Sequence, residues 1–424
     1  MKNHSIKVAL FLFVAFLQIS VYAKQVSQLD ALYRNRQYFE LRDELAKRTA
    51  DKSPELLFYR GAIANKFNQS QESILLLRSY LKSVEGKSDK LRDAYELLAD
   101  NFVKTYQYAK AADTYKLLLD KFGSEFDADK KRDAETSFNL WNALRGAPPQ
   151  TVSFAADTRI QATRDKAALL NVPVEINKQS MNFVFDTGAN LSTVTASTAQ
   201  KLNLKIIDAE LSIGSSTDQR VASKLAVAPN LKIGSVILRN VVFLVLEDKA
   251  LFFPQINYQI NGIVGFPVIE AFRAVTITRK DEVFIKARPA KRKYEQNMCL
   301  DELMPLVAAT AGDERKIFVF DTGAVTSSFY PAFYKSRKEE IEKRGKKQSV
   351  KIGGAGGFKE IIVYLLDEPT LAISGKTAKF NRMQVLTEPV NEESRYYDGV
   401  FGQDLIKQFA SLTLDFDSMS IIFE

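Results

Sequence analysis

The feature that most constrains the fold is a five-residue sequence that occurs twice. Phe-Asp-Thr-Gly-Ala begins at Phe185 and begins again at Phe320. A second pair of segments, 262–277 and 399–414, shares both glycines and several apolar positions at nearly the same offset. Two matched segments with nearly equal spacing indicate an internal duplication. We therefore predict two similar lobes, at about 151–290 and 295–424.

Each copy predicts a strand that ends in a rigidly held carboxylate. Apolar residues run into the Asp, and Thr-Gly then turns the chain sharply. The Gly permits backbone conformations closed to other residues and lets backbone amides approach the carboxylate. A single Asp-Thr-Gly is weak evidence, because short motifs arise by chance and an ordinary strand-ending turn would explain one copy.

Two copies on duplicated lobes predict one shared site. If the lobes pack about a twofold axis, equivalent residues meet at that axis, so Asp186 would face Asp321. Two carboxylates this close cannot both ionise easily, so they share one proton and titrate as a pair. The ionised member can take a proton from water while the protonated member donates to a carbonyl oxygen. Such a pair can hydrolyse an amide without His, Cys or metal.

The residue inventory fits that chemistry. Residues 1–23 have a basic start, an apolar run and small residues before a cut after Ala23, which is typical of a secretory signal peptide; an uncleaved anchor helix is the alternative. The only His is His4 and the only Cys is Cys299. A processed chain would therefore lack Ser–His and Cys–His pairs and His-ligated zinc. We expect no cofactor and no metal.

The charge pattern argues against one class of partner. The formal net charge is +8, but no dense basic block interleaved with aromatic residues accompanies it. Such a block is the usual footprint of nucleic-acid binding. We therefore expect no nucleic-acid partner.

Residues 151–424 resemble the aspartic proteases of the pepsin–retropepsin superfamily. The resemblance implies an all-β, bilobal acid-protease fold made of two retropepsin-like lobes. It also implies that Asp186 and Asp321 form the catalytic dyad and that the next residues support it. The implied supporting residues are Thr187 and Thr322, whose hydroxyls would bond across to the opposite lobe, the turn glycines Gly188 and Gly323, and the glycines of the apolar-apolar-Gly segments behind each turn, Gly265 and Gly402.

The residue after each turn glycine departs from the pepsin pattern. Ala189 and Ala324 stand where pepsins usually have Ser or Thr, and they match retroviral proteases instead. A hydroxyl there can hydrogen-bond the ionised carboxylate and lower its pKa. We therefore predict a dyad less acidic than that of pepsin, with activity nearer neutral pH. The single duplicated chain also differs from retroviral proteases, which are homodimers of one lobe.

Two segments are candidates for the flaps that cover substrate. The first is 211–227, with a tip near Ser215–Asp218, and the second is 350–365, which is rich in glycine. A lid needs a mobile tip, which glycines provide. The tentative substrate-binding residues are Ser215, Ser216, Gly354, Gly356 and Gly357. A phosphate-cradling loop is the alternative for the second segment, but no Lys-Ser/Thr and helix follow as that loop requires.

Residues 24–147 predict an all-α domain. Gly and Pro are scarce, and apolar residues recur at i, i+3, i+4 and i+7. Segments 56–81 and 95–122 each predict two amphipathic helices around a turn, and their small and aromatic positions resemble tetratricopeptide (TPR) repeats. The resemblance implies a TPR-like helical-repeat domain with a groove for a partner peptide; a generic helical bundle is the alternative.

The leading hypothesis is an exported aspartic endopeptidase, periplasmic or secreted, that acts on protein or peptide substrates. We expect no stable membrane span once the signal segment is cleaved. The alternative is a non-catalytic peptide-binding module, in which a protease-like fold is joined to a TPR-like adaptor domain. The presence of both Asp residues favours the enzyme, because a degenerate copy tends to lose one of them.

Overall fold

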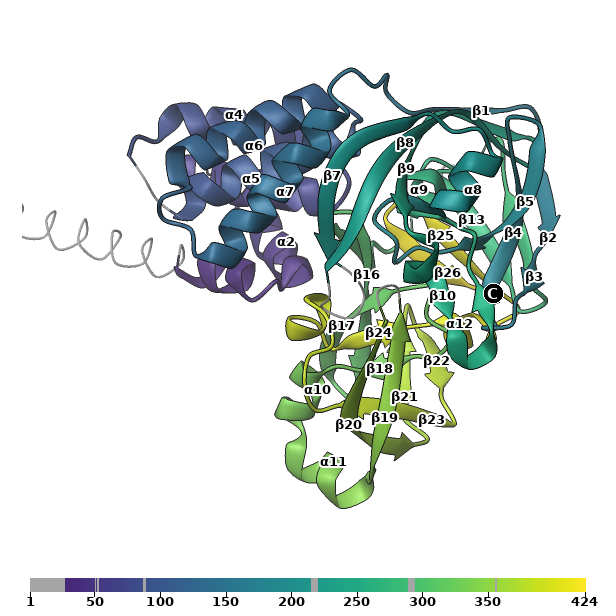
Figure 1. Ribbon diagram of the computed structural model, residues 1–424. Helices are drawn as coiled ribbons and strands as arrows, with labels where there is room; N and C mark the ends of the chain where they lie inside the picture. The colour runs from purple at the N-terminus through teal and green to yellow at the C-terminus, as the bar shows by residue number, and fades with distance from the viewer. Residues whose placement is uncertain are drawn as a thin grey trace, which may run out of the picture.

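The computed structural model describes residues 27–49, 51, 53–86, 89–214, 220–288, 294–354 and 357–424. An N-terminal helical region is followed by a larger β-rich region, which packs beside it (Figure 1). The predicted signal peptide lies outside the described residues. Within those residues, no helix is both long enough and apolar enough to cross a membrane.

The helical region begins at residues 27–34, which are helical, and continues with α2 (Tyr38–Ala46), α3 (Pro54–Lys66), α4 (Ser70–Ser83), α5 (Asp89–Lys104), α6 (Tyr108–Phe122) and α7 (Ala128–Ala143). Local chemistry sets several of the helix starts. Pro54 suits the first turn of α3, where its missing N–H is not needed. Asp127 caps α7 by accepting the Lys130 N–H at 2.8 Å.

Three helix-to-helix turns share one conformation. Each turn contains one residue with left-handed backbone: these are Arg36, Asn68 and Tyr106, with φ of 55°, 59° and 56°. The residue after each is Gln, and its N–H donates to the carbonyl oxygen five residues earlier at 2.7–2.9 Å. This is the hydrogen-bond pattern of a Schellman helix end. The helical region is therefore built from recurring hairpins, while the TPR class itself stays a prediction.

The β-rich region contains two large sheets. The first consists of β1 (Thr151–Phe154), β3 (Thr163–Arg164), β4 (Leu170–Ile176), β5 (Gln179–Phe185), β6 (Ser192–Thr195), β7 (Ile206–Gly214), β8 (Arg220–Ile233), β9 (Val236–Leu246) and β12 (Gly262–Val264). The second consists of β15 (Met298–Asp301), β16 (Met304–Ala311), β17 (Glu314–Phe320), β18 (Ser328–Phe329), β19 (Lys346–Gly354), β20 (Gly357–Asp367), β21 (Thr370–Ile373), β22 (Lys376–Lys379), β23 (Arg382–Leu386) and β24 (Gly399–Phe401).

The two large sheets pair their strands in the same way. In the first, β12 lies parallel to β5 and antiparallel to β6; in the second, β24 lies parallel to β17 and antiparallel to β18. β6 and β18 are then each parallel to another strand, β9 and β23. The duplicated segments thus occupy equivalent positions in two sheets of one arrangement. The lobe boundaries near 290 and 295 stay predictions.

A third sheet joins the two halves. It consists of β2 (Thr158–Gln161), β14 (Glu282–Ile285), β13 (Ala274–Thr278), β25 (Ser411–Asp415) and β26 (Ser420–Phe423), in that order. At its centre, Thr276 lies opposite Thr413, and their hydroxyl oxygens are 2.7 Å apart. Thr276 and Thr413 are counterparts in the sequence duplication, and contact between counterparts is the geometry of a twofold axis.

Shorter elements complete the β-rich region. They are α8 (Ala196–Lys201), η1 (Asp248–Leu251), β10 (Phe252–Phe253), η2 (Pro254–Ile256), β11 (Tyr258–Gln259), α9 (Phe266–Glu270), α10 (Pro331–Ser336), α11 (Lys338–Arg344), η3 (Glu393–Arg395) and α12 (Gln403–Ile406). Of these, α9 and α12 matter most for the site, because each directly follows the strand that lies beside an Asp-Thr-Gly turn.

The turn edge of the helical region contacts the β-rich region. The side chains of the three left-handed turn residues all reach across. Arg36 pairs with Asp301 at the end of β15, Asn68 donates to Glu270 Oε1 at 3.0 Å, and Tyr106 OH donates to the carbonyl oxygen of Pro267 at 3.3 Å. The contacts go to both halves of the β-rich region, so the helices are packed against both.

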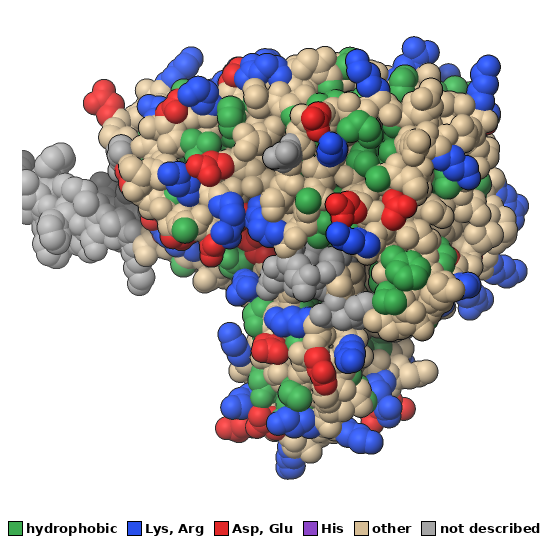
Figure 2. All heavy atoms as spheres, in the orientation of Figure 1, with side chains coloured by type: hydrophobic (Ala, Val, Ile, Leu, Met, Phe, Trp, Pro, Cys, Tyr) green, Lys and Arg blue, Asp and Glu red, His purple; other side chains and the backbone are tan. Residues whose placement is uncertain are grey.

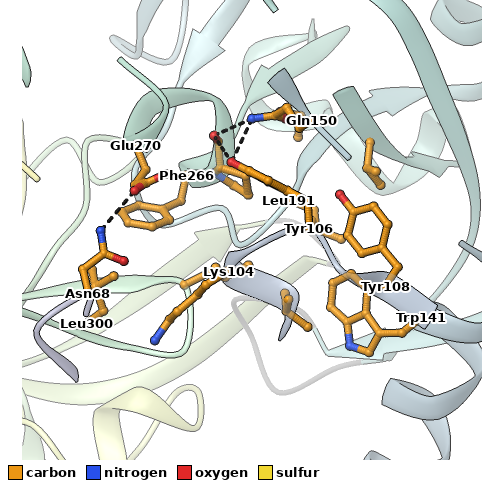
Figure 3. A pocket seen from close by; sticks show the side chains of 15 residues that line it. Asn68, Lys104, Tyr106, Tyr108, Trp141, Gln150, Leu191, Phe266, Glu270 and Leu300 are labelled. Atoms are coloured by element: carbon orange, nitrogen blue, oxygen red, sulfur yellow. Dashed lines mark hydrogen bonds between the residues drawn. The ribbon is translucent and has the colours of Figure 1, made fainter. Parts of the chain in front are cut away.

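A small pocket lies at this junction (Figure 3). Tyr108 stacks on Trp141 at its helical side, with ring centroids 5.7 Å apart. Leu191, Phe266 and Glu270 line it from the β-rich region. Its volume of about 20 Å³ leaves room for about one water molecule. The pocket is therefore a gap between packed units, too small for a peptide.

Charged side chains are mixed on the face shown in Figure 2. Lys and Arg lie among Asp and Glu over both regions and do not gather into one patch. This face carries no concentrated positive charge, despite the net charge of the chain.

Candidate active site

The two motif aspartates lie at equivalent strand ends. Asp186 follows β5 and Asp321 follows β17, and each of these strands has a paired neighbour on both sides. The Asp186 N–H donates to the carbonyl oxygen of Val264 at 3.0 Å, and the Asp321 N–H donates to that of Phe401 at 3.0 Å. A strand paired on both sides is rigid, so each carboxyl projects from a fixed backbone.

Thr187 and Thr322 join the two motif turns by reciprocal hydrogen bonds. Both side chains are fully buried. The N–H of each Thr donates to the hydroxyl oxygen of the other at 3.0 Å. The Thr187 hydroxyl then donates to the carbonyl oxygen of Phe320 at 2.8 Å, and the Thr322 hydroxyl to that of Phe185 at 2.6 Å. Four buried bonds therefore fix the relative position of the two turns.

This arrangement brings Asp186 and Asp321 together. Their carboxyl groups are hydrogen-bonded to each other. Backbone donors also face them: the Gly188 N–H lies 2.8 Å from Asp186 Oδ1, and the Gly323 N–H lies 2.7 Å from Asp321 Oδ1. A carboxyl–carboxyl hydrogen bond requires a proton on one partner, so the geometry is that of a pair sharing one proton.

Burial raises the pKa of both carboxyls above the usual range for Asp. The pKa of Asp321 rises well above it, because the negative charge of Asp186 adds to the effect of burial. The pKa of Asp186 is raised by burial too, while its hydrogen bonds from Asp321 and from backbone N–H groups oppose the rise. The two groups titrate as a pair, with one proton held above the pH at which an isolated Asp would lose it.

The turn glycines are required for a reason that differs from our expectation. Neither Gly188 nor Gly323 adopts a positive φ, so the conformational freedom of glycine is not used at these turns. A Cβ on Gly188 would lie 2.6 Å from Asp321 Cγ, and one on Gly323 would lie 2.5 Å from Asp186 Oδ2. Each glycine therefore makes room for the carboxyl of the opposite turn, a contact that exists only in the folded pair.

Gly265 and Gly402 sit directly behind the two turns. Their N–H groups donate to Ser192 Oγ and Ser327 Oγ, each at 3.0 Å. Sequence reasoning missed both serines. The same offset that relates the two Asp residues also relates Ser192 to Ser327, so extending the duplicated motif by three residues would have found them.

Ala189 and Ala324 contribute backbone groups to the site. Their N–H groups face the carboxyls of Asp186 and Asp321, respectively. Their carbonyl oxygens accept the N–H groups of the residues that begin α9 and α12, at 2.8 and 2.9 Å. A methyl side chain offers no hydroxyl donor, so only backbone N–H groups lower the pKa of the pair from this position.

The two halves of the site are not identical. The Ser327 N–H and hydroxyl both donate to Asp404, whereas Pro267 occupies the position equivalent to Asp404 in the first half. Gln403 follows Gly402, whereas Phe266 follows Gly265. Sequence reasoning singled out neither Asp404 nor Gln403, because a residue that breaks the duplication carries no signal from it.

The structure describes only part of the two predicted flaps. β7 and β8 form one hairpin and β19 and β20 another, in which Gly354 lies opposite Gly357. Gly357 has a φ of 128°, a conformation that favours glycine at this tip. Ser215, Ser216 and Gly356 lie outside the described residues. No hydrogen bond in the described part of the chain joins Gly354 or Gly357 to the Asp pair, so their substrate-binding role stays a prediction.

The chemistry open to this site is acid–base chemistry. One carboxylate and one carboxylic acid within hydrogen-bond reach can remove a proton from water and deliver a proton to a second oxygen. Over the ranges that the structure covers, no cluster of three or more His, Cys, Asp or Glu side chains is placed to hold a metal ion.

The raised pKa of Asp321 predicts a pH-dependent effect on stability. A carboxyl whose pKa is raised on folding stabilises the fold most below its unfolded pKa, and this contribution is lost as the pH rises toward the folded pKa. Asn cannot ionise, so Asp321→Asn should raise the melting temperature relative to wild type at pH 7. The difference should shrink toward pH 4. Calorimetry of both proteins from pH 4 to 8 measures it, and a difference independent of pH would contradict the raised pKa.

Comparison with known proteins gives a family match over part of the chain and several similar solved structures. Residues 172–268 match the family model described as aspartyl protease. A search of curated protein sequences found no match. Solved structures that resemble this one include a retropepsin-like aspartic protease from Rickettsia conorii, at 18% identity and a TM-score of 0.23, covering 32% of this chain and 91% of that one. Basic 7S globulin from soybean is also similar, at 10% identity and a TM-score of 0.40, covering 65% and 95%.

The family match covers the Asp186 turn and the strand that ends before Gly265, and thus only part of the first half of the β-rich region. The match ends before the second motif. The helical region and the second motif are therefore interpreted from the structure alone.

Proposed function

We propose that this chain is an aspartic endopeptidase that hydrolyses peptide bonds with a water molecule held between Asp186 and Asp321. The observation that carries the proposal is the hydrogen-bonded carboxyl pair, whose two turns are fixed by the reciprocal Thr187 and Thr322 bonds. Fixed geometry and a shared proton are the two requirements of this chemistry.

The residues would act in a definite order. The ionised carboxylate takes a proton from the water as its oxygen attacks the carbonyl carbon of the peptide bond. The protonated carboxyl donates its proton to the carbonyl oxygen, which gives a tetrahedral diol. The proton taken from water then passes to the amide nitrogen as the C–N bond breaks, and one hydroxyl of the diol returns its proton to the other carboxylate as the carboxylic acid forms. The pair ends with one proton, as it began, so no cofactor is consumed.

The experiment is direct. Purified protein lacking residues 1–23 is incubated with a denatured protein and a peptide library from pH 3 to 8, and products are read by mass spectrometry. Internal cleavage that is absent with Asp186→Asn supports the proposal. Peptides that bind but stay intact at every pH would instead support the alternative of a non-catalytic peptide-binding module.

Export to the periplasm or the outside of the cell remains part of the proposal. It rests on the sequence of residues 1–23 alone. Cell fractionation of a tagged full-length chain tests it, and the mass of the mature protein shows whether cleavage follows Ala23.

The two alanines of the motifs predict how the pH range can be moved. A hydroxyl beside an ionised carboxylate lowers the carboxyl pKa. The double variant Ala189→Ser/Ala324→Ser should therefore shift the acidic limb of the kcat/KM profile to lower pH. The profile is measured on one good peptide substrate. The pair Ala189→Gly/Ala324→Gly, which adds no hydroxyl, serves as the control and should not move the limb downward.

A further inference from the structure

Gln403 is a fully buried polar side chain beside the Asp321 turn. Its Nε2–H donates to the carbonyl oxygen of Thr322 at 2.6 Å, and its backbone N–H donates to that of Ala324 at 2.9 Å. Its Oε1 has no hydrogen-bond partner within the described residues. A buried amide oxygen without a partner costs stability, so the side chain is held by the Thr322 bond against a local penalty.

The Thr322 bond reaches the carboxyl pair through a single peptide group. The carbonyl that accepts from Gln403 belongs to the same peptide as the Gly323 N–H. That N–H donates to Asp321 Oδ1 at 2.7 Å and also bonds to the carboxyl of Asp186. Hydrogen bonds in a chain polarise one another in a low-dielectric interior. Donation to the carbonyl therefore makes the N–H a stronger donor to both carboxyls.

The first half of the site has no such bond. Phe266 occupies the position equivalent to Gln403, and its backbone N–H makes the equivalent bond to the Ala189 carbonyl oxygen at 2.8 Å. Its ring has no donor, and it packs edge-on against Phe416, with ring centroids 5.6 Å apart. The two turns are thus alike in backbone and unlike in this one side chain.

We propose that Gln403 is a positioning residue that, from one half of the site only, strengthens the Gly323 N–H as a donor to the Asp pair by polarising the Thr322–Gly323 peptide. It touches neither carboxyl and acts through the peptide group between. Its effect on catalysis rests on the proposed function, whereas its effect on the titration of the pair does not.

The test compares Gln403→Met with Phe266→Met. Met fills a similar volume to Gln without a donor, and at position 266 it changes the mirror site without removing a hydrogen bond. Asp carboxyl carbons are labelled with ¹³C and titrated by NMR, and the pair is assigned with Asp186→Asn and Asp321→Asn. In Gln403→Met both midpoints of the pair should rise by roughly half a pH unit, because a weaker N–H donor stabilises the ionised form less. Phe266→Met should leave them in place.

Two results would overturn the inference. One is unchanged midpoints in Gln403→Met with a lower melting temperature, which is a structural role alone. The other is an equal shift in both variants, which is a general packing effect. If Gln403→Met does not fold, Gln403→Glu keeps the shape of the side chain. A protonated Glu can donate to the Thr322 carbonyl oxygen and an ionised one cannot, so a single pH titration of this variant compares the site with and without the donor.

Enzyme kinetics separates this inference from the proposed function. If wild type cleaves peptides, both limbs of the kcat/KM profile should move to higher pH in Gln403→Met by about the same half unit. If wild type cleaves nothing at any pH, the proposed function fails, and the NMR titration still decides the role of Gln403.

Discussion

Replacing either motif aspartate with Asn should lower kcat for peptide hydrolysis by roughly 10²–10⁴-fold. Asp186→Asn and Asp321→Asn each remove one of the two carboxyls, and neither remaining group can act as both proton acceptor and proton donor in the attack on the peptide bond. Because the two residues act as one unit, the double variant should be little worse than either single variant. Product formation at saturating peptide measures kcat directly.

The control for this prediction is Asp313→Asn. Asp313 lies at the exposed turn between β16 and β17, and β17 is the strand that ends just before Asp321. It has the same chemistry and lies in the same sheet, but it is not in the carboxyl pair, so its substitution should leave kcat within about twofold. Full activity in Asp186→Asn would show that some other group activates the water. Additive losses in the double variant would show that the carboxyls do not act together.

Replacing Asp301 with Ala should lower the free energy of unfolding by about 3–5 kcal/mol. Asp301 is 8% exposed and joins the two regions of the chain. It pairs with Arg36 and Lys66 from the helical region and accepts the hydroxyl of Tyr397. The loss is large because Asp301→Ala leaves Lys66, itself 6% exposed, as a buried charge without its partner. Urea unfolding followed by far-ultraviolet circular dichroism and by the fluorescence of Trp141 measures the change.

The double variant Lys66→Met/Asp301→Leu separates two contributions to the free energy of unfolding: the penalty for leaving one buried charge without its partner, and the stability that the intact ion pair itself provides. Replacing a buried ion pair with apolar side chains of similar size is often neutral, so this variant should recover a large part of the lost stability. Asp313→Asn again serves as the exposed control. If Asp301→Ala unfolds at the same urea concentration as wild type, the cluster of Asp301 with Arg36, Lys66 and Tyr397 (the Asp301 cluster) does not hold the two regions together.

The Asp301 cluster also has a pH signature. The positive charges of Lys66 and Arg36 hold the pKa of Asp301 well below its usual range, although burial alone would raise it. A carboxyl whose pKa is lowered on folding stabilises the fold above its unfolded pKa of about 3.9, and the contribution is lost as the pH falls toward the folded pKa. This pH dependence is opposite in sign to that of Asp321. Lowering the pH should therefore weaken the contact between the helical and β-rich regions, while it stabilises the protonated carboxyl pair.

Other contacts also join the helical region to the β-rich region. Arg36, Asn68 and Tyr106 are left-handed turn residues of three successive hairpins, and all three reach the β-rich region. The hairpin of β7 and β8 is tied to the helices as well, because Arg220 Nη1 lies 2.8 Å from Asp133 Oδ1 in α7. The helical region is therefore a packed part of the folded chain rather than a tethered module.

Some of the site could be read from the sequence because the duplication repeats local chemistry. An apolar strand that ends in Asp-Thr-Gly-Ala is a local pattern, and its recurrence with a second matched segment indicates equivalent positions in two similar sheets. That was enough to pair Asp186 with Asp321, whereas the bonds of Thr187 and Thr322 across the site were expected only from the family resemblance. The helices were predictable for the same reason, since an apolar periodicity of 3.6 is local.

The rest depended on contacts between segments far apart in the chain. The role of Gly188 and Gly323 is to leave space for the opposite carboxyl, a distance that no local pattern encodes. Gln403 breaks the duplication and gains its meaning only from its bond to Thr322. Asp301 and Lys66 belong to no motif in the sequence, and only the packing of helices on sheet makes them a buried pair. The sequence by itself determined which groups could do chemistry, whereas the tertiary structure decided how they are held, because position and proton affinity both depend on neighbours brought together by folding.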